Sequence, residues 1–375
     1  MANNASAQLP IGPDAPWLAP LAGFSDLPFR LLCREQGAAA ACTEMVSAKG
    51  LVYGTRQKRT REGEAGGATE ALLTTTRADM PLVVQLFGAE PEFLAEAAKL
   101  LAARGFSWFD LNMGCSVPKV TKTGAGSALL REPARALAAA SALIRAAGPG
   151  RTGCKLRLGW DAASPVYLDL AKALEDAGAA WITLHPRFAR QGFSGTADAG
   201  ALEKLVRAVS IPVLASGDLF SAGDGLRCLD TGASGVMFAR GAMANPAIFR
   251  QYHSLRNRMV KTGTLPPKYG QAQEQAPRQE QAGDGGGGKT ADTDIPGREE
   301  LLALILRHAE LARELTPGKA GRKGYPPALL KMRTVVPRYV RHLPGVKHLR
   351  LALANCESWE ELHDILRRFF SDAHE

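Results

Sequence analysis

A cysteine at the tip of an apolar run is the residue of this chain best placed to do chemistry. Residues 108–112 predict a buried strand, which leads through Asn112, Met113 and Gly114 to Cys115. Polar and reactive residues at strand ends are where α/β enzymes keep their active sites. A free thiol is mostly protonated at neutral pH and can donate a proton, although a lone cysteine more often packs as a small hydrophobe. Position alone favours neither interpretation.

Other apolar runs also end in residues that could bind a ligand. In chain order these ends carry Gly23, Gln85, Lys155 and Arg157, His185 and Arg187, Ser216, Gly217 and Asp218, and Ala239, Arg240 and Gly241. An isolated ammonium is costly to bury, so Lys155 in an apolar strand end predicts an anion or an electron-rich ring beside it. Glycines at the last two strand ends would let backbone N–H groups approach a phosphate.

Alternating strands and helices must position these residues. Strands are predicted at 17–19, 39–43, 82–87, 108–112, 154–158, 181–185, 213–216 and 235–239, with amphipathic helices at 92–104, 133–147, 164–177 and 199–209. Eight such units predict an α/β fold, a parallel (β/α)8 TIM barrel. A doubly wound sheet is the alternative, but no G-x-G-x-x-G follows the first strand.

Composition divides the chain into four parts. We predict a flexible N-terminus at 1–14, a barrel at 15–260, a low-complexity linker at 261–297, and a small C-terminal α-helical domain at 298–375 with helices at 299–315, 328–341 and 359–370. Residues 283–290 match the phosphate-loop pattern G-x-x-x-x-G-K-T. Because no strand feeds this segment and no helix follows it, we reject it as a nucleotide site.

Positive charge is concentrated in the C-terminal part. The 375 residues carry a formal net charge of +9, and residues 315–350 contain nine Lys and Arg with no Asp or Glu. Tyr325 and Tyr339 lie within this basic segment, and Arg56, Lys58, Arg59 and Arg61 form a shorter one. Cations neutralise phosphates and aromatic rings stack on bases, so the clustering predicts a nucleic-acid partner beyond a general role in solubility.

Several classes of protein are excluded. The six cysteines form no C-x-x-C pair and no Cys/His cluster, so we expect no metal site and no disulfide framework. Residues 1–10 lack the pattern of a signal peptide. No apolar run is long enough to span a membrane. We therefore expect a cytoplasmic protein and, as its state of association, a monomer.

Five segments together resemble the tRNA-dihydrouridine synthases, namely residues 18–30, 110–115, 124–130, 155–160 and 216–218. The resemblance covers most of 17–249 and continues in weaker form to Phe370. It implies an FMN-dependent barrel with a helical tRNA-binding domain. Such an enzyme reduces the C5–C6 double bond of uridine in tRNA to 5,6-dihydrouridine, with NADPH or NADH as reductant.

The resemblance also implies roles for individual residues. Cys115 would be the catalytic general acid that protonates C5, and Asn112 and Arg187 would position the uracil. Gln85 would hydrogen-bond the flavin ring and Lys155 would stabilise its reduced anion. The implied FMN-binding set is Pro20, Leu21, Ala22, Gln85, Lys155, His185, Ser216, Gly217, Asp218, Ala239 and Arg240. The implied tRNA contacts are Lys122, Lys331, Arg333 and Arg338.

This chain departs from the family pattern in several places, among them the long linker and the segment 333–339, which contains Pro337. Ser116 stands where a proline usually follows the cysteine, Ser216 where asparagine is usual, and Ala239 where glycine is usual. Pro337 should perturb its helix. Two other functions remain alternatives: a flavin barrel acting on a free small molecule, like a dihydroorotate dehydrogenase, or a catalytically inactive RNA-binding protein. The basic C-terminal part argues against the first, and the set of flavin-side residues argues against the second.

Overall fold

The computed structural model describes residues 8–58, 68–263, 296–316 and 326–371. Several predicted features lie outside the described residues. They are the linker at 264–295, including the phosphate-loop pattern, the N-terminal residues 1–7, and the side chains of Arg59, Arg61, Lys319, Arg322, Lys323 and Tyr325.

Eight parallel strands close into a barrel. They are β1 (Trp17–Leu18), β2 (Ala40–Cys42), β4 (Leu82–Phe87), β5 (Trp108–Met113), β6 (Thr152–Arg157), β7 (Trp181–His185), β8 (Val213–Ala215) and β9 (Gly235–Phe238). Each strand pairs with the next in this order, and β1 pairs with both β2 and β9, which closes the ring. Every predicted strand is present within two residues of its expected bounds, so the (β/α)8 barrel is confirmed.

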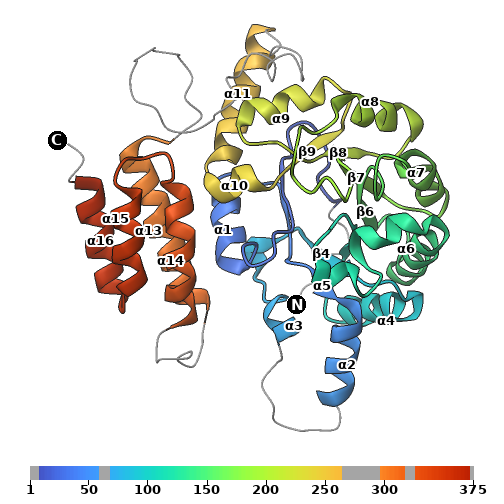
Figure 1. The fold of residues 1–375 in the computed structure, drawn as a ribbon, viewed down its shortest axis with the longest axis horizontal. Coiled ribbons are helices and arrows are strands. Elements are labelled where there is room, and N and C mark those ends of the chain that lie inside the picture. The colour runs from blue at the N-terminus through green and yellow to red at the C-terminus, as the bar shows by residue number, and fades with distance from the viewer. Residues whose placement is uncertain (1–7, 59–67, 264–295, 317–325, 372–375) are drawn as a thin grey trace.

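Helices surround the barrel, as Figure 1 shows. Before β6 they are α1 (Leu27–Glu35), α2 (Ala48–Lys58), α3 (Ala68–Ala71), α4 (Pro91–Ala102), α5 (Pro118–Thr121) and α6 (Pro133–Ala147), with 3-10 turns η1 (Arg77–Asp79) and η2 (Gly126–Arg131). After β6 they are α7 (Tyr167–Asp176), α8 (Ala199–Ala208), α9 (Ala222–Leu229), α10 (Arg240–Ala244) and α11 (Ile248–Thr262). The last of these runs two residues into the predicted linker.

A short strand that the sequence analysis missed, β3 (Val46–Ser47), adds an irregularity beside β4. Cys42 pairs with Val83 and Val46 pairs with Leu86, so the β2–β3 side holds one residue more than β4 between the same two pairs. The extra length is absorbed at Thr43, whose Oγ1 accepts the backbone N–H of Gln85 at 3.1 Å. At Gln85, a side-chain hydroxyl thus replaces a backbone carbonyl as the acceptor of the strand's N–H group.

Large side chains fill the amino-terminal end of the barrel interior. Trp17 and Trp181 pack edge to face, with ring centroids 5.7 Å apart, in a buried cluster that includes Val83, Leu214 and Met237. Gly153 makes room for Trp181, because a Cβ there would lie 2.0 Å from the indole. With this end filled, only the carboxyl end of the barrel is left to hold a site.

In the part of the C-terminal region that the structure describes, four helices follow the barrel: α13 (Arg298–Leu315), α14 (Pro327–Tyr339), α15 (Val346–Asn355) and α16 (Trp359–Ser371). Three were predicted, and α15 was not. Pro337 lies inside α14, two residues before that helix ends. Figure 1 shows these helices (orange to red) beside α1 and α10.

The C-terminal helices and the barrel share one hydrophobic core. Phe29 and Cys33 of α1 belong to the same buried cluster as Leu329 and Met332 of α14. Leu27, Leu31 and Leu32 of α1 also pack with Leu304 and Leu311 of α13. Among the described residues, no helix is both long enough and apolar enough to cross a membrane.

Candidate active site

The predicted site residues meet at one end of the barrel. Because all eight strands are parallel, Gln85 (β4), Asn112 (β5), Lys155 (β6) and His185 (β7) lie at their carboxyl ends, on the same side. Ser216 and Ala239 follow β8 and β9 directly, and residues 20–22 follow β1. Cys115 lies in the loop between β5 and α5 and is half-buried.

The loop that carries Cys115 is held from several directions. Asn112 Oδ1 accepts the backbone N–H of Cys115 at 2.9 Å, and Ser127 donates its backbone N–H to the Cys115 carbonyl at 2.9 Å. Arg157 donates Nε–H to the Gly114 carbonyl at 2.9 Å. These contacts restrain Gly114 and Cys115, the two residues just before the position where proline is usual.

Gly126 is required for the Cys115 loop to fit. Its φ is +63°, and a Cβ there would lie 2.6 Å from the Cys115 carbonyl oxygen and 2.9 Å from Val120 Cγ1. Both the backbone conformation and the space therefore demand glycine. The segment 124–130, which carries part of the family resemblance, therefore shapes the loop that holds Cys115.

A buried carboxylate lies beneath the strand ends. Asp110 is 1% exposed, and its Oδ2 accepts a hydrogen bond from Gln85 Nε2 at 2.7 Å. Burial raises the pKa of Asp110 to about 7, against the opposing effects of Gln85 and Lys155. Burial likewise lowers the pKa of Lys155 to about 8, although Asp110 favours its charged form. Among the described residues, no hydrogen-bond or ion-pair partner lies within contact distance of the Lys155 ammonium.

His185 is neutral in this site. Burial is the largest cause that lowers its pKa to about 2, and the cations of Lys155, Arg157, Arg187 and Arg240 add to it. Arg187 Nη1 lies 3.2 Å from His185 Nε2. A guanidinium can only donate, so Nε2 is the acceptor and the ring proton resides on Nδ1.

Arg187 is enclosed by acceptors from the protein. It is 2% exposed and forms a two-pronged pair with Asp218, both N···O distances being 2.6 Å. Its remaining N–H groups reach His185 and the carbonyls of Ser194 and Gly195, so all five donors are used. A contact between this side chain and the uracil, as the resemblance implies, would require one of these bonds to open.

The turn after β8 has an unusual backbone. Gly217 has a φ of +101° and Asp218, a non-glycine residue, has a φ of +54°. A Cβ on Gly217 would lie 2.4 Å from His185 Cδ2, so the imidazole packs directly against this turn. Asp218 also accepts from Arg240 Nη2 at 2.9 Å. One carboxylate therefore joins the ends of β7, β8 and β9.

The site has an excess of positive charge. Four cations lower the pKa of His185, and the Asp218 carboxylate pairs with two of them, Arg187 and Arg240. Lys155 and Arg157 therefore leave positive potential at the strand ends. This donor set suits an anionic ligand that approaches the carboxyl end of the barrel.

Two exposed aromatic rings, which were not among the predicted site residues, border the carboxyl end of the barrel. Phe193 is 61% exposed and stacks on His185 with ring centroids 6.1 Å apart, and Phe220 is 46% exposed. The Arg240 guanidinium lies 4.3 Å from the Phe193 ring and 4.8 Å from the Phe220 ring. Both rings come from loops, where no periodic pattern marks them, and only the packing around Arg240 reveals them.

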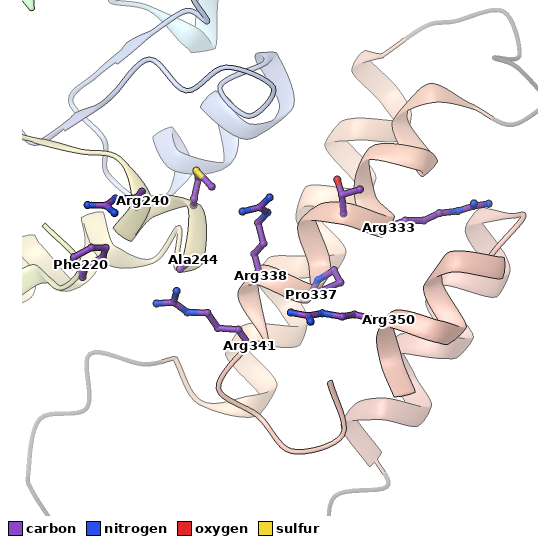
Figure 2. A pocket seen from close by; sticks show the side chains of 10 residues that line it. Phe220, Arg240, Ala244, Arg333, Pro337, Arg338, Arg341 and Arg350 are labelled. Atoms are coloured by element: carbon purple, nitrogen blue, oxygen red, sulfur yellow. The ribbon is translucent and has the colours of Figure 1, made fainter. Parts of the chain in front are cut away.

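An arginine-lined cleft separates the barrel from the C-terminal helices. It has a volume of about 780 Å³ and is bordered by Phe220, Arg240 and Ala244 on the barrel side (Figure 2). Arg333, Arg338, Arg341 and Arg350 line the helical side. Of the described residues that line it, none is acidic. Arg240 lines the cleft and also pairs with Asp218, so this one side chain borders both the cleft and the strand-end site.

The four predicted tRNA contacts lie in different surroundings. Lys331 is turned toward the barrel, where it pairs with Asp26 at 2.5 Å. Arg333 donates to the carbonyls of Ala354 and Cys356, and Arg338 lies over the Phe24 ring at 4.6 Å. Lys122 is exposed after α5, on the barrel. The structure thus brings only Arg333 and Arg338 into the cleft.

Arg341 and Arg350 also line the cleft, although they were not among the four predicted tRNA contacts. Neither forms a hydrogen bond or an ion pair with another described residue. Both were visible in the sequence as members of the basic segment, but their direction depends on the turn between α14 and α15. In Figure 2, Arg341 points toward α10 and Arg350 points toward α14.

Fold and site together define a (β/α)8-barrel enzyme with its functional groups at the strand ends and a helical C-terminal part. A family model described as dihydrouridine synthase matches residues 17–286, and the chain belongs to this family.

Individual relatives agree with that assignment. The probable tRNA-dihydrouridine synthase 1 of Synechocystis sp. is 40% identical over 357 residues, which cover 95% of this chain and 86% of that protein. The probable tRNA-dihydrouridine synthase of Treponema pallidum is 38% identical over 64% of this chain and 70% of its own. A solved old yellow enzyme homologue from Zymomonas mobilis has 12% identity and a TM-score of 0.41, with coverage of 66% of this chain and 89% of that one.

Proposed function

We propose that this protein is an FMN-dependent tRNA-dihydrouridine synthase in which Cys115 is the proton donor. The observation that carries the proposal is the position of Cys115 at the same barrel end as Gln85, Lys155 and His185, in a restrained loop. In this proposal residues 15–260 are the catalytic barrel and residues 298–375 the tRNA-binding part of a cytoplasmic, monomeric enzyme. NADPH or NADH serves as reductant.

The residues present fit a flavin mononucleotide. Phosphate is an anion, and the turn at Gly217 and Asp218, with Arg240 beside it, offers backbone N–H groups and a cation. Ser216 and Ala239 flank this phosphate site. Residues 20–22, Gln85, Lys155 and His185 would border the ring system. When bound, the flavin would supply a hydride to C6 of the uracil.

The protein's own residues would complete the reaction. Addition of hydride at C6 leaves negative charge that must be quenched by a proton at C5. Cys115 Sγ–H would deliver that proton, and Asn112 would hold the Cys115 backbone. To orient the uracil as well, the Asn112 amide would have to give up its contact with Met45 Sδ. Lys155 would stabilise negative charge on the flavin ring because its ammonium has no ionic partner of its own in contact. His185, being neutral with its proton on Nδ1, would donate a hydrogen bond without adding charge.

Detection of bound FMN and of the tRNA product tests the proposal. The purified protein is expected to be yellow, and tRNA from a strain that lacks it is expected to lose dihydrouridine at one or more positions. Mapping by mass spectrometry would decide the matter. Normal dihydrouridine at every position, or turnover of a free pyrimidine in the absence of RNA, would contradict it.

The arginine cleft would hold the tRNA backbone, and this gives a prediction. The double variant Arg341→Ala, Arg350→Ala removes two cleft cations that pair with no other described residue. We expect tRNA binding about tenfold weaker, with the slope of log affinity against log salt concentration reduced by roughly 2, one per lost phosphate contact. Fluorescence anisotropy with labelled tRNA at several salt concentrations measures both.

A charge-matched control separates the cleft from net charge. Arg145 on α6 and Lys172 on α7 are exposed on the outer layer of the barrel. The double variant Arg145→Ala, Lys172→Ala should leave the salt slope nearly unchanged. Equal effects from the two double variants would show that the cleft is not the binding surface.

A further inference from the structure

A chain of hydrogen bonds runs from the buried Asp110 to the backbone of Cys115. Asp110 Oδ2 accepts from Gln85 Nε2 at 2.7 Å, and Gln85 Oε1 accepts from Asn112 Nδ2 at 2.7 Å. Asn112 Oδ1 then accepts the backbone N–H groups of Gly114 at 3.1 Å and Cys115 at 2.9 Å. Asp110, Gln85 and Asn112 are each at most 5% exposed. The proposed reaction gives Asp110 no part.

The two ends of this chain determine the orientation of both amides between them. Asp110 Oδ2 is an acceptor, so Gln85 must turn its NH2 group toward it. Its carbonyl is then left for Asn112, whose NH2 must face it. At the other end, backbone N–H groups can only donate, and they require the carbonyl of Asn112. Only one arrangement of the two amides pairs each donor with an acceptor along the chain.

We propose that Asp110 is a positioning residue, which acts through Gln85 and Asn112 to fix the loop that carries Cys115. Its importance for the reaction rests on the proposed function, in which Cys115 delivers a proton to the uracil. A change at Asp110 would reach Cys115 without any direct contact between them.

The surroundings of Asp110 support this role over that of a partner in an ion pair. Its Oδ1 has no hydrogen-bond partner among the described residues, and no ion pair joins it to Lys155 at contact distance. The Gln85 amide is therefore the group that Asp110 holds directly. Burial of a carboxylate costs free energy. The contribution of Asp110 in return is that it fixes the orientation of the Gln85 and Asn112 amides.

The link from Asp110 to Asn112 is tested by substitutions that reverse the donor-to-acceptor direction of this chain of hydrogen bonds. In Asn112→Asp, carboxylates stand on both sides of Gln85, whose single NH2 group can serve only one of them. We expect a lower urea midpoint of unfolding. Adding Asp110→Asn should raise that midpoint again, because Gln85 can then turn round and form both of its hydrogen bonds. If the two substitutions act additively, the linkage is refuted.

The same single and double substitutions, made in a Gln85→Leu background, separate linkage through the amide from simple charge repulsion. Leucine has no amide to link positions 110 and 112, so the rescue of Asn112→Asp by Asp110→Asn should largely disappear. Rescue of undiminished size in that background would show that only the carboxylate charges interact, and would overturn the proposal.

Hydrogen exchange of the Gly114 and Cys115 amides reports the position of the loop itself. In the FMN-loaded full-length protein, Asp110→Leu and Gln85→Leu should each speed exchange at these two amides by about tenfold, because Asn112 loses its anchor. Thr183→Val is the matched control. It removes a buried hydroxyl on β7 that has no hydrogen-bond partner among the described residues, and should leave the exchange unchanged.

Unchanged exchange in both leucine variants would refute the positioning role. Neither readout involves turnover, so this failure is distinct from failure of the proposed function. Normal activity of a Cys115 variant would remove the proton-donor assignment and leave the measured linkage intact.

Discussion

Replacing Cys115 by alanine is expected to slow uridine reduction about 10²- to 10⁴-fold, the range that a positioned general acid contributes. The methyl group keeps the backbone bonds of the loop to Asn112 and Ser127 and removes only the Sγ proton. FMN should remain bound and should still be reduced by NADPH. Single-turnover reaction of the pre-reduced variant with tRNA, with dihydrouridine measured by mass spectrometry, isolates the affected step.

A second thiol provides the control for this substitution. Cys228 is buried on α9, in the outer helical layer, and Cys228→Ala should leave the single-turnover rate unchanged. A Cys115→Ala enzyme that reduced tRNA at the normal rate would end the proton-donor assignment.

The second large effect concerns Lys155 and has a defined pH dependence. Burial lowers its pKa to about 8, so the side chain is charged below that pH and neutral above it. Reduction of the flavin by NADPH should therefore slow as pH rises through about 8. Lys155→Met should slow this half-reaction about 10- to 100-fold and remove its dependence on pH in that range, since a nearby charge contributes a few kcal/mol.

Potentiometry of the bound flavin checks the same charge directly. The two-electron potential of Lys155→Met should fall by roughly 30 mV or more, which corresponds to about 1.4 kcal/mol. Lys204→Met, on the exposed side of α8, should change neither potential nor pH profile. A profile for Lys155→Met that still falls through pH 8 would assign the titration to another group.

The barrel was predictable because its strands are continuous apolar runs with polar ends. Residues 82–87 and 181–185 are strands over the expected bounds, and 133–147 is a helix over the expected bounds. The irregularity at Thr43 was not predictable, because one extra residue between two paired strands leaves no signature in composition. The same holds for α15, whose helix opens without a side-chain cap after Gly345.

The sequence indicated which residues gather at the strand ends, but not which hydrogen bonds and ion pairs they form there. The ends of the strands identified Gln85, Asn112 and Lys155, since parallel strands bring their ends together. The sequence could not reveal that all N–H donors of Arg187 form hydrogen bonds with protein acceptors, or that Lys331 pairs with Asp26. Charge can be counted from the sequence, but the direction of a long side chain depends on which acceptors the fold places within reach.

The packing of α1 between the barrel and α13–α14 has a consequence for how the molecule melts. Phe29 and Leu329 belong to one buried cluster, so neither part can lose its ordered interior while the other keeps it. Heat or denaturant should therefore produce a single cooperative transition. The C-terminal helices and the strand ends of the barrel consequently share one free energy of unfolding, so a substitution that destabilises either part destabilises both.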